Sequence, residues 1–178
     1  MRTYKTEGFV IKRRNFNEAD RIITVFSKQN GKIQIKVPGV RKITSRRSGH
    51  IELLNYSLFT IYQAKSLPIL TEVESIETYT SLKKDLNQMS TLFHVCEIIE
   101  GLCPENQENM EVFFLLRNFL DNLKKEKDWK KLLDEFEINL LTCLGYYRSD
   151  HEINKINRIV FIEKILERKL KTKQINLC

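Results

Sequence analysis

Apolar and polar residues alternate with the period of a β-strand over much of the first 80 residues. Residues 32–37 show this most clearly, with apolar Ile33, Ile35 and Val37 on one face and polar Lys32, Gln34 and Lys36 on the other. Runs rich in branched and aromatic residues predict four further strands, at 6–16, 21–27, 56–63 and 69–79. The dipeptide Asn30-Gly31 predicts a β-hairpin before residues 32–37, because both residues tolerate a positive φ.

The period changes to 3.6 residues at Ser81, which indicates amphipathic helices. Four are expected, at about 81–100, 110–123, 129–144 and 160–171, and the first should bury Leu82, Leu86, Met89, Phe93, Cys96 and Ile99. Asp128 can cap the third helix and Gly145 can end it. We assign the apolar stripes to a helical core, with a partner groove as the alternative. The basic end at 164–173 is either a solvated face or a second phosphate contact.

The change of period divides the chain into two predicted domains of an α+β protein. Residues 1–80 are expected to form an N-terminal five-stranded OB-fold β-barrel, and residues 81–178 a C-terminal all-helical domain. Five short strands in 80 residues suit the OB-fold, which binds oligonucleotides on a sheet face and its loops.

The net charge of +7 is concentrated in the first third of the chain. Residues 1–50 contain 13 Lys and Arg against three Asp and Glu, whereas residues 81–178 contain 16 of each sign. Such concentration is typical of a surface that binds a polyanion. The alternative is a solvated basic face that has no partner.

The strongest candidate for such a surface is the loop within residues 36–50, which is rich in phosphate ligands. Guanidinium, ammonium and hydroxyl groups bind phosphate oxygens, and exposed aromatic rings stack on bases. The predicted DNA-binding residues are Arg13, Arg14, Lys32, Lys36, Arg41, Lys42, Arg46, Arg47, Tyr56 and Tyr62. A structural role is the alternative for each tyrosine. Replacing the four loop cations, Arg41, Lys42, Arg46 and Arg47, with Ala is expected to weaken DNA binding and flatten its salt dependence.

No constellation of residues predicts an enzyme. The chain lacks the phosphate-loop, dinucleotide-binding, nucleophile-elbow and zinc-protease motifs. Glu18 and Asp20 are expected to shape a turn and pair with Arg21, and Glu135 and Glu137 should point to different sides of a helix. The four cysteines are widely spaced, without C-x-x-C, so no metal site is predicted. Because the motifs are missing, no catalytic residue and no cofactor are predicted either.

No apolar run approaches the ~20 residues that would span a bilayer, and the first ten residues lack the apolar core of a secretory signal. We therefore expect a cytoplasmic protein without a membrane partner, and binding to DNA would associate it with the nucleoid.

Several segments resemble the RecO recombination mediators, a family of DNA repair proteins. The similarity is most specific over residues 8–46, in the run Gly8–Ser27 and in Gly31-Lys-Ile-Gln-Ile, Gly39-Val-Arg-Lys and Ser45-Arg. The helix leading into Leu144-Gly-Tyr and the basic stretch 163–170 also resemble the family. The resemblance implies the same fold, binding of single- and double-stranded DNA, and annealing of complementary strands without ATP. It further implies action with RecR in loading RecA onto DNA coated by single-strand binding protein, whose C-terminal tail contacts the helical domain.

One departure from the family bears on metal binding. Many members carry a four-cysteine zinc module after the Leu-Gly-Tyr turn, whereas here residues 147–157 join almost directly to the last helix. The resemblance therefore implies no zinc. Two other functions stay open at this point: an RNA-binding OB-fold module, and a non-enzymatic adaptor whose basic face meets an acidic protein.

Overall fold

The computed structural model describes residues 3–126, 128–148 and 155–172. The chain divides into two compact units. One comprises residues 1–79 together with 104–110 and is called the barrel unit here. The other comprises residues 80–103 and 111–178 and is called the helical unit.

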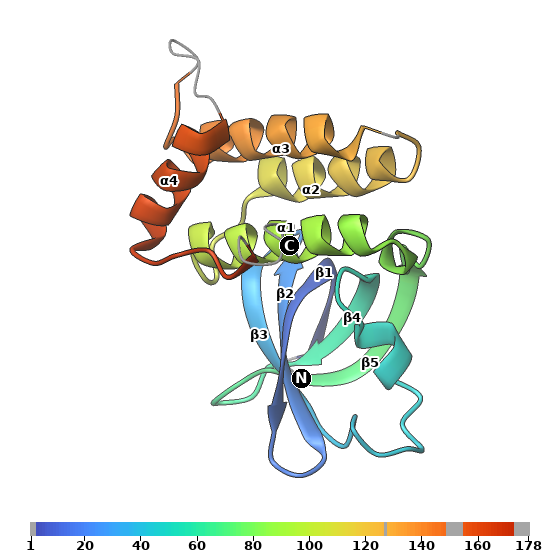
Figure 1. Cartoon of the computed structure of the whole chain (residues 1–178). Helices are drawn as coiled ribbons and strands as arrows, with labels where there is room; N and C mark the ends of the chain where they lie inside the picture. The colour runs from blue at the N-terminus through green and yellow to red at the C-terminus, as the bar shows by residue number, and fades with distance from the viewer. Residues whose placement is uncertain (1–2, 127, 149–154, 173–178) are drawn as a thin grey trace. The chain divides into compact units, whose positions relative to one another are not determined.

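Five strands close the barrel unit in the order β1-β2-β3-β5-β4 (Figure 1). They are β1 (Thr3–Phe16), β2 (Asp20–Ser27), β3 (Gly31–Val37), β4 (Tyr56–Tyr62) and β5 (Ile69–Glu77). β3 and β5 are parallel, whereas every other pair is antiparallel. The five predicted strands are present, and this strand order is that of an OB-fold.

The alternating pattern sets the core of the barrel unit. Ile33, Ile35 and Val37 of β3 are buried inside it, as the period of two predicts. They pack with branched and aromatic side chains from the other strands, and the 3-10 helix Ser48–Ile51 adds Ile51 to the same cluster. This apolar core holds the loops between the strands on a rigid support.

The turn between β2 and β3 differs from the expected two-residue hairpin. Ser27 pairs with Gly31, which leaves a loop of three residues, 28–30. Gly31 has a φ of +62°, whereas Asn30 does not have a positive φ. A Cβ atom on Gly31 would lie 1.8 Å from the carbonyl oxygen of Gln107, so glycine is required here for packing as well as for φ.

The segment 104–110 belongs with the barrel unit although it follows the first long helix in the chain. The backbone N–H of Asn106 donates to the carbonyl oxygen of Lys32 at 2.9 Å. The Gln34 side chain donates to Glu105 Oε1 at 2.7 Å. The predicted division at residue 80 did not anticipate this return of the chain to β3.

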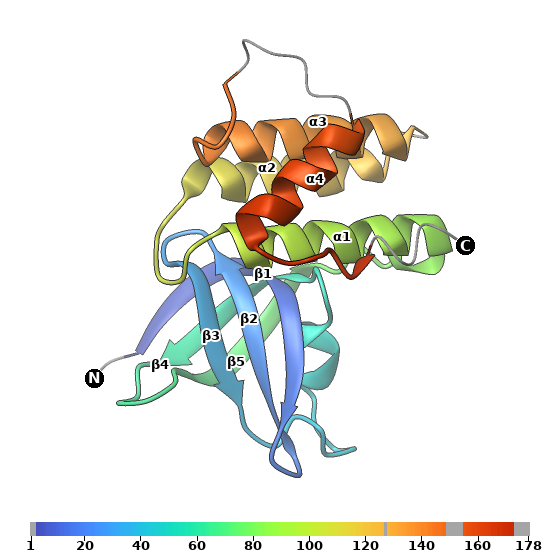
Figure 2. The same cartoon turned by 60° about the vertical axis from the view of Figure 1, so that its left-hand side comes forward.

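The helical unit contains a 3-10 turn (Leu82–Lys84) and four helices, α1 (Leu86–Leu102), α2 (Met110–Leu123), α3 (Trp129–Cys143) and α4 (Lys155–Leu166). α2 and α3 lie side by side, and α4 crosses them at a steep angle (Figures 1 and 2). Asp128 caps α3 by accepting from the N–H of Lys131 at 3.2 Å, and Gly145 follows it with a φ of +75°. Both signals at the ends of α3 are thus confirmed. Among the described residues, no helix combines the length and apolar character needed to cross a membrane.

Three expectations for the helices were wrong. The first helix, expected from about residue 81, begins at Leu86, because Asp85 is extended and caps α1 by accepting from the N–H of Gln88. Leu86 and Phe93 were expected to be buried but are 83% and 41% exposed. The buried face of α1 includes the polar residues Ser90 and His94, so it does not coincide with the stripe of apolar residues. α4 begins at Lys155 and ends at Leu166, several residues earlier than predicted. It ends there because Glu167 adopts a φ of +55° and the chain then turns toward Glu97.

A buried polar network joins three helices of the helical unit. His94 contacts Glu137 Oε1 at 2.7 Å through Nε2 and Thr172 Oγ1 at 3.0 Å through Nδ1. Arg158 donates to Glu137 Oε2 at 2.5 Å and to Asp134. Burial would raise the pKa of Glu137, but His94 and Arg158 outweigh it and lower that pKa. Glu137 is buried and Glu135 is exposed, so they point to different sides of α3 as predicted.

Candidate nucleic-acid interface

The loop after β3 is attached to the hairpin that joins β1 and β2. The backbone N–H of Arg41 donates to the carbonyl oxygen of Ala19 at 2.9 Å, and its guanidinium donates to that of Asn17 at 3.2 Å. The N–H of Gly39, which has a φ of +65°, donates to Asp20 Oδ1 at 2.8 Å. These bonds join residues 17–20 to residues 39–41, and Figure 1 shows the β1–β2 hairpin and the loop after β3 at the same end of the barrel. We name residues 12–21 and 38–47 the basic end of the barrel unit.

Four of the ten predicted DNA-binding residues are exposed on the basic end. They are Arg14 from β1 and Arg41, Lys42 and Arg46 from the loop. Exposed cations remain available to an incoming phosphate, and their mutual repulsion falls when a polyanion neutralises them. This group is therefore the part of the prediction that the structure brings together in an accessible form.

Three other predicted cations lie in the basic end or next to it but already have partners. Arg13 forms an ion pair with Glu52 at 2.5 Å, and Lys36 lies 3.2 Å from Asp20 and over the Phe16 ring. Arg47 is half-buried and donates to the carbonyl oxygens of Pro38 at 2.7 Å and Leu70 at 3.1 Å. These hydrogen bonds give Arg47 a structural role in holding the loop, which the sequence did not distinguish from phosphate binding.

Asp20 shapes the turn as expected, but the partner predicted for it was wrong. Its carboxylate accepts from Gly39 N–H and pairs with Lys36, and these contacts lower its pKa, the backbone hydrogen bond most. Arg21, the expected partner, instead donates from Nε to Asn15 Oδ1 at 3.3 Å. Arg21 is half-buried and adds a cation to the basic end that the sequence analysis did not assign.

The remaining three predicted residues lie away from the basic end. Lys32 is only 8% exposed, because the segment 104–110 packs along the start of β3. Tyr56 was expected to be exposed, but it is 3% exposed, stacks on Phe9 at 4.9 Å between ring centroids and donates its hydroxyl to Glu7. Tyr62 is 47% exposed and pairs with Thr3, at the end of β1 opposite the hairpin. The expectation that Lys32 and Tyr56 are accessible to DNA was therefore wrong, because both are buried.

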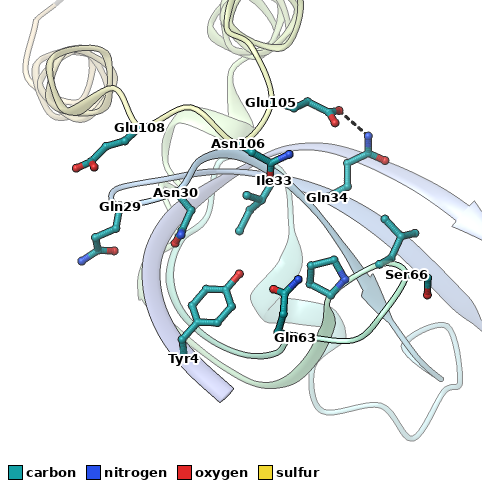
Figure 3. Close-up of a pocket in the computed structure, with 12 residues that line it drawn as sticks. Tyr4, Gln29, Asn30, Ile33, Gln34, Gln63, Ser66, Glu105, Asn106 and Glu108 are labelled. Atoms are coloured by element: carbon teal, nitrogen blue, oxygen red, sulfur yellow. Dashed lines mark hydrogen bonds between the residues drawn. The ribbon is translucent and has the colours of Figure 1, made fainter. Parts of the chain in front are cut away.

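A cavity elsewhere in the barrel unit lacks the positive charge of the basic end. A cavity of about 620 Å³ is bounded by the turns 28–30 and 63–68, the start of β3 and the segment 104–110 (Figure 3). Its wall is rich in amide side chains and includes the carboxylates of Glu105 and Glu108, whereas none of its twelve lining residues is Lys or Arg. The carboxylates would repel a phosphate, so this cavity is not a candidate for binding the sugar-phosphate backbone of a nucleic acid.

The cysteines offer no sign of a metal site in the part of the chain that the structure describes. Cys96 and Cys103 are buried and Cys143 is half-buried, and burial raises the pKa of the Cys96 thiol. The fourth, Cys178, lies outside the described residues. No three His, Cys, Asp or Glu side chains among the described residues are grouped so that they could hold a metal ion.

The closed barrel followed by helices defines an OB-fold protein with a helical C-terminal part. Family profiles agree: the profile described as "Recombination protein O N terminal" matches residues 1–79, and "Recombination protein O C terminal" matches residues 83–149. The chain belongs to the RecO family of DNA repair and recombination proteins.

Individual relatives carry the same description. "DNA repair protein RecO" of Pelotomaculum thermopropionicum is 32% identical over 146 residues, which cover 82% of this chain and 57% of the relative. The protein of that name from Acetivibrio thermocellus is 35% identical over 147 residues, covering 82% of this chain and 59% of the relative. The matched part of the chain therefore spans less than two thirds of the length of these relatives.

Among solved structures, the crystal structure of the S. pombe Stn1-ten1 complex aligns with 54% of this chain and 76% of that chain. The TM-score of 0.34 and the 13% identity are too low to carry an argument.

Proposed function

We propose that this chain is a recombination mediator that binds single- and double-stranded DNA and anneals complementary strands without ATP. Together with RecR it helps to load RecA onto DNA coated by single-strand binding protein. Membership of the RecO family supports the DNA repair role. The observation that carries the binding mode is the set of exposed cations on one surface: Arg14, Arg41, Lys42 and Arg46.

The mechanism that this surface supports is electrostatic. Two DNA strands repel each other through their phosphates, and cations held between them reduce that repulsion. The loop is tied to the β1–β2 hairpin by hydrogen bonds from the N–H groups of Arg41 and Gly39, so its backbone is held beside the hairpin before DNA arrives. Contacts to phosphate carry no sequence information, which suits a protein that must act on any pair of complementary strands.

The helical unit is the proposed contact for the tail of single-strand binding protein. It exposes several large apolar side chains, which an apolar peptide could cover: Leu86, Phe93, Phe114, Tyr146 and Val160.

The test is annealing of two complementary oligonucleotides, both naked and coated with single-strand binding protein, without ATP and over a range of salt concentrations. The proposal expects the protein to accelerate annealing in both cases and the acceleration to fade as salt rises. Annealing of naked strands alone would remove the partner contact from the proposal and keep the DNA contact. If the protein accelerates neither reaction, the proposed function is wrong, and competition between RNA and matched DNA becomes the next measurement.

A triple variant tests the assignment of the surface. Arg41→Ala, Lys42→Ala and Arg46→Ala together should flatten the slope of log K against log salt by up to ~2 on single strands, at ~0.7 for each lost phosphate contact. The matched control is Lys124→Ala, Lys125→Ala and Lys130→Ala, which removes three exposed cations of the helical unit. Equal slopes for the triple variant and the unmodified protein would contradict the assignment.

A further inference from the structure

The loop 38–47 of the basic end carries an apolar side chain at its tip that the electrostatic mechanism does not use. Ile43 is 105% exposed, so it is as open to solvent as in an extended chain. The other large apolar side chains described as exposed range from 37% to 83%. Single exposed apolar residues are common on protein surfaces, so the exposure of Ile43 gains meaning only from its surroundings.

A tight turn holds Ile43 at this position. The N–H of Ser45 donates to the carbonyl oxygen of Lys42 at 2.9 Å, which closes a β-turn with Ile43 and Thr44 at its corners. The Ser48 hydroxyl donates to the Ser45 carbonyl oxygen at 3.0 Å. The Arg47 guanidinium donates to the carbonyl oxygen of Pro38 and so ties the end of the loop to its beginning. The turn is therefore supported from the side that leads back into the barrel unit.

Cations surround this apolar tip. Arg41 and Lys42 precede Ile43 and Arg46 follows it, and all three are exposed. A polyanion held by these cations would bring its own apolar parts toward Ile43. In nucleic acid those parts are the stacked faces of the bases, which an aliphatic side chain can enter as a wedge.

We propose that Ile43 inserts between neighbouring bases of DNA bound at the basic end and unstacks them, while Arg41, Lys42 and Arg46 hold the flanking phosphates. This inference rests on the proposed function, because it requires DNA at this surface. Unstacked bases are free to test new partners, so the wedge links phosphate binding to the exchange of base pairs during annealing. The ligand it selects is a flexible single strand or a duplex with an easily opened step.

The test uses the full chain and oligonucleotides that carry 2-aminopurine, whose fluorescence rises when it leaves the base stack. Binding of the unmodified protein should raise the fluorescence of single-stranded and duplex probes. Ile43→Ala should abolish most of the rise and weaken single-strand binding by about tenfold, with an unchanged salt slope. Ile43→Phe should preserve the rise, because a ring can also fill the gap between bases.

Ile76→Ala is the matched control. Ile76 is 53% exposed on β5, near exposed Glu72 and Glu74, and its truncation should leave both the fluorescence and the affinity unchanged. If Ile43→Ala binds DNA and raises the fluorescence as the unmodified protein does, the wedge is wrong. If the unmodified protein binds with a steep salt dependence but no fluorescence change, the wedge fails and the proposed function stands. If it does not bind DNA at all, both fail together.

Discussion

Two arginines of the barrel unit and two of the helical unit have opposite environments. Arg41 and Arg46 are exposed on the basic end, and the side chain of Arg41 donates to the carbonyl oxygen of Asn17. In the helical unit, by contrast, the side chain of Arg158 is 3% exposed and meets two carboxylates, and Arg168 donates to Glu97 at 2.5 Å. The helical unit therefore contains ion pairs with buried members, whereas Arg41 and Arg46 of the barrel unit stay on the surface.

The difference has a physical cause. A guanidinium that loses its water must regain hydrogen bonds and a counter-charge, so burial selects arginines with carboxylates beside them. An exposed arginine keeps its water and needs no partner to be stable. Variants of the buried ion pairs in the helical unit should therefore change stability, and variants of the exposed cations in the loop 38–47 should change binding.

The largest expected effect is on Arg158. Arg158→Met removes the guanidinium that donates to Glu137 while this carboxylate is still buried, so the free energy of unfolding should fall by about 3–5 kcal/mol. Chemical denaturation followed by circular dichroism measures this change. Lys164→Ala, at an exposed position on the same helix, should change it by less than about 0.5 kcal/mol. Equal destabilisation by the two variants would remove the contrast between buried and exposed cations.

The next effect is on Glu97 and depends on pH. Burial would raise its pKa, but hydrogen bonds from Lys171, Arg168 and Thr172 outweigh this and hold the pKa at about 2, below the ordinary 4.5. Because the folded pKa is lowered, Glu97 contributes stability above pH 4.5 that is lost as pH falls toward 2. Glu97→Gln should cost about 2 kcal/mol at neutral pH, from weakened charged hydrogen bonds.

Denaturation curves of Glu97→Gln and the unmodified protein at several pH values measure this effect. The two stabilities should converge as the pH is lowered through the range from 4.5 to 2. A difference that stays constant over that range would mean that the charge on Glu97 does not stabilise the helical unit.

Two adjacent arginines test the contrast within the barrel unit. Arg47→Ala leaves the carbonyl oxygens of Pro38 and Leu70 without their donor and should lower the free energy of unfolding by about 1–2 kcal/mol. Arg47→Lys should recover only part of this, because one ammonium cannot reproduce the fork of the guanidinium. No loss of stability in Arg47→Ala would return Arg47 to the group of phosphate ligands.

The smallest effect on stability is expected at Arg46. Arg46→Ala should leave the free energy of unfolding within about 0.5 kcal/mol of the unmodified value, because the side chain is exposed. Its single-stranded DNA binding should lose ~0.7 from the salt slope, which titrations at several salt concentrations measure. A stability loss like that of Arg47→Ala would show that exposure does not separate the two roles.

The strands were predictable because each has a local signal. The alternation of residues 32–37 and the branched run before it require no knowledge of distant residues, and the same holds for the caps of α3. The face of α1 was not predictable in this way. His94 is buried because Glu137, 43 residues away, offers it a hydrogen bond, and no local period announces such a partner.

The candidate site divides along the same line. The concentration of cations in residues 1–50 is visible in the sequence, and so is the loop that contains Arg41, Lys42 and Arg46. The separation of these three from Arg47 and Lys32 is not visible, because all five are basic residues in the same short stretch. Contacts with Leu70 and with the segment 104–110 make the difference.

The sequence by itself therefore determined the strands of the barrel, most of the helices, and the part of the chain where positive charge collects, since periodicity, caps and charge are local properties. The tertiary structure alone decided which cations are exposed, which of Tyr56 and Tyr62 is buried, and how long the turn before Gly31 is. Those outcomes depend on what lies opposite each side chain, and in this protein the opposing groups come from up to 78 residues away in the chain.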